Sequence, residues 1–290
     1  MNEVFVTFGS ENHLAGTLTL PSRSQQPVAL LLLNAGVIQR MGPHRVNVKI
    51  ARRVARQGIV TLRFDFPGQG ESSSVASTVP FERQAVLDVQ AAMDHVQRTT
   101  GIQRFAIAGI CSGAHHGVTV AQADSRVVGL WMLDGFFYPT VKTGLHRLKR
   151  RLSLQSLPEL GSWAAAKLAG LIRAAALRLA SSNVDEGQGS GRYPFPPRKT
   201  YAATMNQLAD RGVDMRLVFS GSMKPFFNYA DQLRDAFPAD RFVDKVHCRI
   251  EPGIDHTLTT LKAQRLCIDE ISTWLDRLGL NESPGSPRGR

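Results

Sequence analysis

A cysteine set among small residues is the first candidate for chemistry in this chain. Cys111 is the centre of the sequence GICSG, residues 109–113, which follows a short apolar run and precedes a helical pattern. In a sharp strand-to-helix turn of this kind, the residues two before and two after the nucleophile must be small. The two glycines meet this requirement for Cys111, whereas Ser112 as the nucleophile would have Ile110 at one of these places. The start of a helix also stabilises a thiolate, so Cys111 is the predicted nucleophile.

A histidine near the other end of the chain is the candidate base. His256 lies in the segment 251–257, between the last strand-like run and the last helical pattern. A loop at this place can reach over the edge of a parallel sheet where its strands end. His256 is therefore predicted to accept the thiol proton and later to deliver it.

The elements around these residues indicate an α/β architecture. Continuous apolar runs alternate with helical patterns, which is typical of a parallel sheet covered on both faces. The runs are 28–34, 58–64, 104–108 and 127–133, and the helical patterns are 46–56, 81–98 and one that begins near 113. The segments 4–8 and 14–20 alternate in polarity, which predicts an antiparallel hairpin at the edge.

The rhythm of strands and helices stops in the middle of the chain and then resumes. Residues 138–211 contain no strand-like run, and the strand patterns return at 215–219 and 241–250, before a closing helix at 261–278. We therefore predict a core formed by 1–137 and 212–280, a helical lid inserted at 138–211, and a flexible tail at 281–290. Between Thr140 and Lys199, eleven Lys and Arg stand against three Asp and Glu, so the insertion is strongly basic.

Composition limits the partners and the compartment. Among 290 residues, 35 Lys and Arg against 24 Asp and Glu give a net charge of +11, which favours acidic partners. The three cysteines are too few for a disulfide framework, and the N-terminus lacks a signal-peptide pattern, so we expect a cytoplasmic protein. Three basic residues interrupt the apolar stretch 163–180, so we expect no transmembrane segment.

Two further motifs complete a resemblance. The loop 63–72 reads R-x-D-x-x-G-x-G-x-S, and 34–37 reads NAGV, after the first buried run. With the cysteine-centred turn and the later histidine, the chain resembles the α/β-hydrolase fold family over 1–137 and 212–278. In that family a histidine stands where this chain has Asn34. More narrowly, the sequence at 36–45 and the cysteine resemble exosortase-associated hydrolases and the cysteine-dependent acyl and aminoacyl shuttles of peptide-synthetase pathways.

The resemblance implies further site residues. An oxyanion hole would use the backbone N–H groups of Ser112 and Val37. Because these assignments follow position, Ser112 need not act through its hydroxyl. Arg40 and His44 either contact the substrate or anchor their loop, and His115 follows the nucleophile on the next helix and is a candidate to face the substrate.

The acid that orients the histidine is less clearly marked. The family places an aspartate in a G-x-x-D loop, and here that loop, 220–224, has Lys224 at the position of the acid. Asp134, directly after the run 127–133, is the preferred replacement. Asp231 is the alternative, and a Cys-His dyad without an acid is a third possibility, because a thiol needs less activation than a serine hydroxyl.

These residues predict an acyl enzyme. An acyl group on Cys111 is a thioester, close in energy to one on a phosphopantetheine arm, so both hydrolysis and transfer are open. The basic insertion suits an acidic carrier protein or a CoA-type donor. The alternatives are a small-molecule ester or lactone hydrolase and a catalytically silent binding protein. We expect no cofactor and no metal, and no nucleic-acid partner, because stacking aromatics do not accompany the basic residues.

Overall fold

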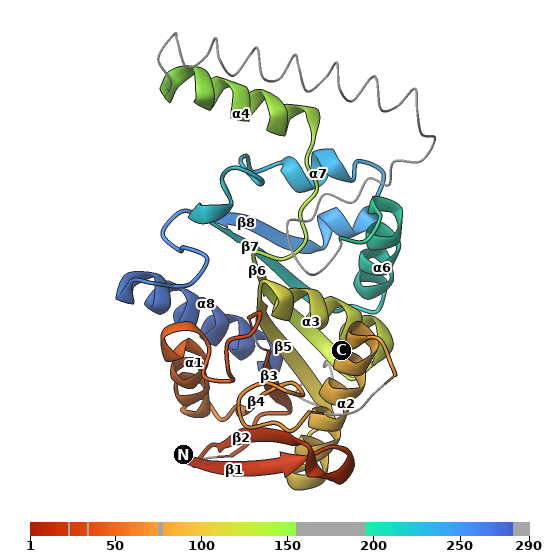
Figure 1. Cartoon of the computed structure of the whole chain (residues 1–290), viewed down its shortest axis with the longest axis vertical. Coiled ribbons are helices and arrows are strands. Elements are labelled where there is room, and N and C mark those ends of the chain that lie inside the picture. The colour runs from red at the N-terminus through yellow and green to blue at the C-terminus, as the bar shows by residue number, and fades with distance from the viewer. Residues whose placement is uncertain (23, 34, 75–77, 155–194, 281–290) are drawn as a thin grey trace, which may run out of the picture.

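A mostly parallel sheet with helices on both sides forms the body of the protein (Figure 1). The computed structural model describes residues 1–22, 24–33, 35–74, 78–154 and 195–280 of the chain. Within these residues one sheet has eight strands in the order β1-β2-β4-β3-β5-β6-β7-β8. The strands are β1 (Asn2–Phe8), β2 (Leu14–Leu20), β3 (Val28–Leu33), β4 (Val60–Phe64), β5 (Arg104–Ile110), β6 (Val127–Leu133), β7 (Asp214–Ser220) and β8 (Val246–Glu251).

The pairing of the strands confirms the predicted architecture. β1 pairs antiparallel with β2, and β2 pairs antiparallel with β4, so the N-terminal hairpin forms one edge of the sheet. From β4 to β8 all neighbouring strands are parallel. Every residue of β3 and β4 is buried, which explains why these strands are continuously apolar or nearly so.

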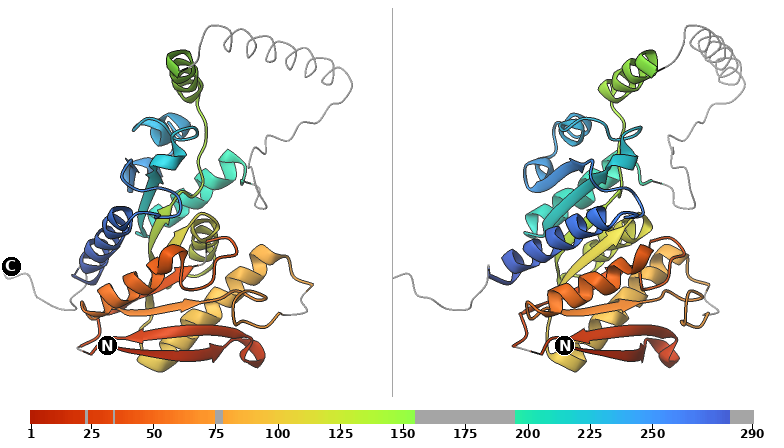
Figure 2. Two further views of the ribbon diagram at one scale, coloured as in Figure 1. Left: turned by 60° about the vertical axis from the view of Figure 1, so that its left-hand side comes forward. Right: turned by 90° about the vertical axis from the view of Figure 1, so that its left-hand side faces the viewer.

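Helices cover the sheet on two faces and give it two apolar cores (Figure 2). One face carries α2 (Phe81–Thr100), α3 (Ser112–Ala123) and α6 (Arg198–Asp210), and the other carries α1 (Val46–Ala55) and α8 (Leu261–Leu280). The chain runs from β3 to β4 on one side and then to β5 on the other side of β3. Such a reversal leaves a crevice at the carboxyl ends of the strands, where ligands bind in open α/β sheets.

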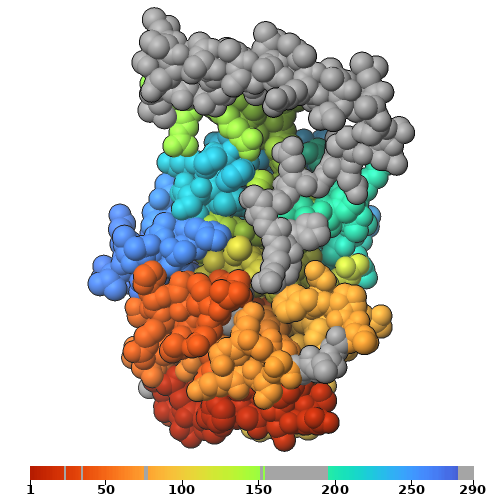
Figure 3. All heavy atoms as spheres, viewed as in Figure 1, coloured from red at the N-terminus to blue at the C-terminus, as the bar shows by residue number. Residues whose placement is uncertain are grey.

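The predicted insertion begins with a helix that stands away from the sheet. In Figures 1 and 3, α4 (Val141–Leu154) lies above the segment that contains α7 (Gln232–Ala236). The contacts are polar and aromatic: Lys142 Nζ lies 2.8 Å from Asp235 Oδ2, the Thr140 and Tyr229 hydroxyls lie 2.6 Å apart, and the rings of His146 and Tyr229 stack with 5.4 Å between their centres. The apolar stretch 163–180 lies outside the described residues, as does the predicted tail 281–290.

The second boundary of the insertion differs from the predicted one at residue 211. Tyr201 and Met205 on α6 are 2% and 0% exposed and belong to the main apolar core, and α6 packs beside α3. This helix therefore belongs with the body of the protein by its packing. No strand-like run marks it, so the sequence grouped it with the insertion.

Candidate active site

Cys111 lies on a strained turn between β5 and α3. Its backbone has φ 56° and ψ −117°, a left-handed φ that is costly for a residue with a side chain. The turn is possible because Gly109 lacks a side chain: a Cβ there would lie 2.3 Å from the carbonyl carbon of Gly113. The Cys111 N–H donates to the Leu133 carbonyl at 2.9 Å, which ties the turn to the neighbouring strand β6.

Asp134 and His256 meet at the same edge of the sheet. Asp134 directly follows β6, and its side chain is fully buried. The Nδ1 atom of His256 lies 2.7 Å from Asp134 Oδ2. Ser220, at the end of β7, donates its backbone N–H to Asp134 Oδ1 and its hydroxyl to Oδ2, both at 2.7 Å. The carboxylate is thus held by three donors when His256 carries a proton on Nδ1.

The loop that carries His256 is fixed by its own polar contacts. The His256 N–H donates to Ser222 Oγ at 3.2 Å. Asp255 accepts the backbone N–H groups of Thr257 and Thr259 at 3.2 and 3.1 Å, and its carboxylate thereby closes the loop before α8. The side chain of His256 remains 40% exposed, so a substrate can reach the ring.

The electrostatics of the pair favour a thiolate beside an imidazolium. A hydrogen bond with His256 lowers the pKa of Cys111, and the backbone N–H of Ser112 lowers it further, against the opposing effect of burial. Hydrogen bonds with Asp134 and then with Cys111 raise the pKa of His256 to about 10. Because the two pKa values move in opposite directions, a proton passes from the thiol to the histidine more readily than between the free side chains.

A hydrogen bond links the two segments that carry the predicted oxyanion donors, Ser112 and Val37. The Gly36 N–H donates to Ser112 Oγ at 2.7 Å, which joins the loop after β3 to the turn that carries Cys111. Val37 is the next residue, and it is 76% exposed. Asn34, which stands at the place of the family's histidine, lies outside the described residues.

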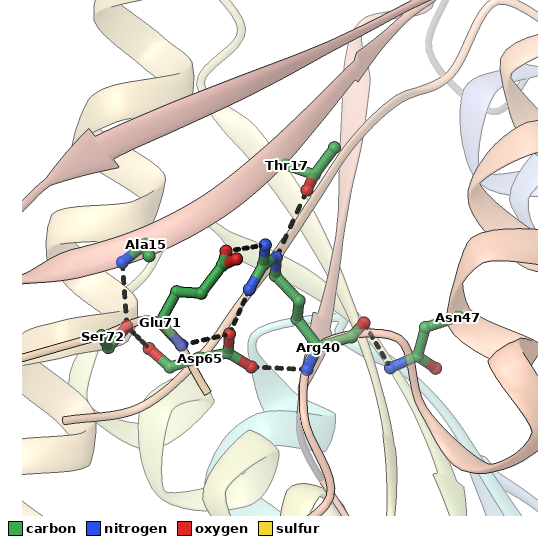
Figure 4. Close-up of polar contacts among 7 residues, drawn as sticks. All are labelled: Ala15, Thr17, Arg40, Asn47, Asp65, Glu71 and Ser72. Atoms are coloured by element: carbon green, nitrogen blue, oxygen red, sulfur yellow. Dashed lines mark hydrogen bonds and ion pairs between the residues drawn. The ribbon is translucent and has the colours of Figure 1, made fainter. Parts of the chain in front are cut away.

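Arg40 anchors its loop and does not lie beside the cysteine. Its guanidinium binds the buried carboxylate of Asp65 and the carboxylate of Glu71, and its backbone N–H also donates to Asp65 (Figure 4). Its Nε donates to Thr17 on β2 at 3.4 Å. These partners belong to β2 and to the loop after β4, on the far side of β3 from β5. Of the two predicted roles, anchoring is the one that the contacts support.

The other predicted substrate residues are not brought to the cysteine and histidine by any described contact. His44 is exposed and has a left-handed φ of 49°. His115 is half-buried in an aromatic cluster, stacked on Phe136 with 3.9 Å between ring centres, and Phe195 meets the edge at 5.6 Å. Burial lowers the pKa of His115 to about 4, so the ring is neutral at physiological pH.

The alternative acid lies elsewhere, and the described residues suggest no metal centre. Asp231 is exposed and precedes α7, and its contacts do not include His256. Lys224 is exposed just beyond the turn that follows β7. In the described part of the chain, His, Cys, Asp and Glu form no group that could hold a metal ion. Nor does a described helix have the length and apolar character to cross a membrane.

Sequence reasoning missed the serines that support this site. The sequence indicates Ser220 and Ser222 only as parts of a loop without its aspartate, and it predicts a backbone role for Ser112, which is rejected as the nucleophile. Each acts through a hydroxyl on a partner distant in the sequence. The sequence signal that could have indicated these supporting contacts is the presence of two serines, Ser220 and Ser222, in the loop where the family carries its acid.

Comparison with known proteins gives the family of the chain. The family model described as "Serine aminopeptidase, S33" matches residues 25–193, more than half of the sequence. The chain belongs to this family. It is an α/β hydrolase, with the fold that the sequence predicted. A search of curated proteins found no match.

Solved structures of low sequence identity share the fold. An esterase from Pyrococcus furiosus has a TM-score of 0.59 at 14% identity, covering 95% of this chain and 91% of its own. The esterase domain of a Rhodothermus marinus protein has a TM-score of 0.55 at 18% identity, covering 95% and 99%. An α/β serine hydrolase without a lid from Xanthomonas campestris has a TM-score of 0.54 at 13% identity, covering 99% and 98%.

Proposed function

We propose that this hydrolase is a cysteine-dependent acyl enzyme that cleaves activated esters or thioesters through a thioester on Cys111. One observation carries the proposal. The residue on the strained turn is a cysteine whose pKa is lowered by His256, and that histidine is bound in turn to a buried carboxylate. This is the order of nucleophile, base and orienting acid found in catalytic triads.

The surroundings of Ser112 favour Cys111 as the nucleophile, although the family description names a serine enzyme. Ser112 is the first residue of α3 and is only 3% exposed, and its Oγ accepts the Gly36 N–H. It is the thiol of Cys111 whose pKa His256 lowers. A buried hydroxyl that already serves a backbone donor is a poor nucleophile beside a thiol of lowered pKa.

In the first half-reaction the Cys111 thiolate attacks the carbonyl carbon of the substrate and forms a C–S bond. The carbonyl oxygen becomes an oxyanion, for which the N–H groups of Ser112 and Val37 are the proposed donors. When the intermediate collapses, the bond to the leaving alkoxide or thiolate breaks. His256 donates its Nε2 proton to the leaving group, because its Nδ1 faces Asp134.

In the second half-reaction His256 takes a proton from water or from another acceptor nucleophile, which attacks the thioester carbonyl. Collapse of this second intermediate expels the Cys111 thiolate and releases an acid or a transferred acyl group. The Asp134 carboxylate stabilises the imidazolium, which is present when the first half-reaction begins and forms again in the second. Its three hydrogen-bond donors support that role.

A neutral ester or lactone substrate is the second candidate. Two of the fold neighbours are described as an esterase and an esterase domain, and the same cysteine and histidine would serve hydrolysis of a small ester. A catalytically silent binding protein is the alternative outside catalysis. It predicts a Cys111 of ordinary reactivity.

The proposal includes an acidic carrier protein or a CoA donor that docks on the basic insertion. Within its described part, Lys149 and Arg150 on α4 are exposed and have no ion pair among the described residues. Phosphates and acidic side chains would be attracted there before they reach the site. The cytoplasmic location likewise stays a prediction.

Intact-protein mass spectrometry tests the proposal. Wild type, Cys111→Ala and Cys111→Ser are mixed with p-nitrophenyl esters and acyl-CoA donors, and adduct mass and released acid are followed. We expect an adduct on the wild type that is absent from Cys111→Ala. Turnover to free acid would indicate hydrolysis, and movement of the adduct to an added thiol or amine would indicate transfer.

Cys248 supplies an internal control. Burial raises the pKa of its thiol to about 12, so iodoacetamide near neutral pH should alkylate Cys111 and leave Cys248 untouched. If no donor acylates Cys111 and iodoacetamide modifies it no faster than a free thiol, nucleophilic catalysis is wrong and the binding-protein alternative stands.

A further inference from the structure

The loop after β3 makes a tight turn against the nucleophile turn. The Ile38 N–H donates to the Ala35 carbonyl at 3.0 Å, which closes the turn over four residues. Gly36, its second residue, has φ +57°, a conformation that glycine adopts without strain. A Cβ at Gly36 would meet nothing within 4 Å, so backbone conformation is the reason for a glycine here.

Side chains from two other segments hold the two central peptides of this turn. The Gly36 N–H, in the peptide Ala35–Gly36, donates to Ser112 Oγ at 2.7 Å. The Gly36 carbonyl, in the peptide Gly36–Val37, accepts from Gln69 Nε2 at 3.4 Å. Because N–H and C=O point in opposite directions across a trans peptide, Gln69 also sets the direction of the Val37 N–H.

The Val37 N–H takes no part in these contacts. Among the hydrogen bonds of the described residues, the Ser112 hydroxyl takes the Gly36 N–H and the turn itself uses the Ile38 N–H, while none uses that of Val37. The donor that the turn leaves available is therefore the one proposed for the oxyanion hole.

We propose that Ser112 is a positioning residue that acts through its hydroxyl as well as its backbone. The hydroxyl fixes the turn 35–38 at the nucleophile turn, so that the N–H groups of Val37 and Ser112 act on one oxygen atom. This inference rests on the proposed function of Cys111. It goes beyond the sequence-based expectation, in which Ser112 contributed a backbone N–H alone.

The physical reason is the cost of an unpaired donor. Ser112 is 3% exposed, so an alanine there would leave the Gly36 N–H facing an apolar methyl group, away from its acceptor. The turn would shift to find another acceptor and would carry the Val37 N–H with it. Removing one oxyanion donor outright lowers kcat by about 100- to 1,000-fold, so displacing one should lower acylation by about 10- to 100-fold.

Two reactions of the same thiol separate this role from others. Acylation by p-nitrophenyl acetate passes through an oxyanion, whereas alkylation by iodoacetamide displaces iodide at a CH₂ carbon and forms none. For Ser112→Ala we expect the rate constant of acylation, measured as the burst of p-nitrophenolate, to fall by about 10- to 100-fold. The dissociation constant of p-nitrophenyl acetate, obtained from the dependence of the burst rate on its concentration, should stay within about twofold of the wild type, and so should the alkylation rate, since substrate binding and the thiolate are untouched.

Matched variants complete the test. Ser272→Ala removes another buried serine hydroxyl, on α8, and should leave both rates unchanged. Ser112→Thr keeps a hydroxyl and should retain more acylation than Ser112→Ala. Gln69→Leu should lower acylation less than Ser112→Ala, because its contact is longer and exposed to solvent.

Several results would overturn the inference. Unchanged acylation in Ser112→Ala would show that the hydroxyl does not position the turn. An equal loss of acylation and alkylation would show that Ser112 acts on the thiol instead. If the wild type itself is slow in both reactions, the proposed function of Cys111 fails first and this role fails with it.

Discussion

The coupling between Cys111, His256 and Asp134 is a property of individual residues that a pH profile can measure. His256 lowers the pKa of Cys111 and Asp134 raises that of His256, so the imidazolium is the link between carboxylate and thiol. Asp134 also acts directly on Cys111, where its negative charge opposes the thiolate, but this effect is the smallest of those on that thiol. The indirect effect through His256 should therefore dominate.

Asp134→Asn should move the alkylation profile of Cys111 to higher pH. Without the carboxylate the pKa of His256 falls, the ring is neutral near pH 7, and the thiolate loses its cationic partner. In the wild type, the rate of iodoacetamide alkylation should rise through a midpoint below 9.0, the ordinary value for a thiol. In the variant the midpoint should lie at higher pH, by about one unit or more.

Ser220→Ala is the control for this prediction. It removes one hydrogen bond to Asp134 and keeps the charge, so its midpoint should move less than that of Asp134→Asn. A midpoint that moves to lower pH in Asp134→Asn would contradict the indirect coupling, because the direct repulsion would then be the larger effect.

The turn between β5 and α3 is an element whose geometry depends on one missing side chain. A Cβ on Gly109 would lie 2.3 Å from backbone atoms of α3, so Gly109→Ala must push the helix away from the strand. We expect a loss of about 1–3 kcal/mol in the free energy of unfolding and a slower alkylation of Cys111, because the strained turn opens. Urea unfolding and mass spectrometry measure the two effects.

Gly117 offers a matched control on the same helix. A Cβ there would meet side-chain atoms of Ile107 and Leu130 at 3.4 and 3.5 Å, which is ordinary contact. Since alanine is the better helix former by about 1 kcal/mol, Gly117→Ala should leave the protein as stable or more stable. Equal effects of the two substitutions would refute the steric explanation of the motif.

Strands and turns could be predicted from the sequence where a pattern of neighbouring residues determines them. The buried strands are continuous apolar runs, and the turn at Cys111 has a glycine two residues before and two residues after the cysteine. The run 241–250 was only partly right: Arg241–Asp244 form a 3₁₀ helix, with the buried Phe242 N–H bound to Asn206 Oδ1 at 3.0 Å, and the strand begins at Val246. A contact with a residue on α6 decides this, and local sequence does not contain it.

In the candidate site, too, single residues could be proposed from the sequence, whereas the contacts between distant segments could not. Asp134 could be proposed because an aspartate directly after a buried strand reaches the edge where parallel strands end. The bonds from Ser220 to Asp134 and from Gly36 to Ser112 join segments 86 and 76 residues apart, so their pairing depends on strand order. Arg40 illustrates the same limit, since its role was decided by Asp65 and Glu71 on another loop.

At the scale of the whole molecule, the uneven distribution of charge is the feature with a functional consequence. The chain carries +11, and the segment 140–199 holds eleven basic and three acidic residues. The described part of this segment includes α4, which stands apart from the sheet and exposes Lys149 and Arg150 (Figure 1). A charge on such a helix acts on an approaching ligand through solvent, where salt screens it.

Salt should therefore distinguish anionic from neutral donors. Between about 0.1 and 1 M salt the Debye length falls from about 10 to 3 Å. The kcat/KM for an acyl-CoA donor should fall by about tenfold or more over this range, as steering is lost, and that for a neutral p-nitrophenyl ester should change little.

Lys149→Glu with Arg150→Glu should weaken the acyl-CoA reaction at low salt and flatten its salt dependence. Arg53→Glu, an exposed charge reversal on α1, should change neither by more than about twofold, because its effect is limited to net charge. Equal sensitivity to all these reversals would show that total charge attracts the donor and that α4 has no special part in its approach.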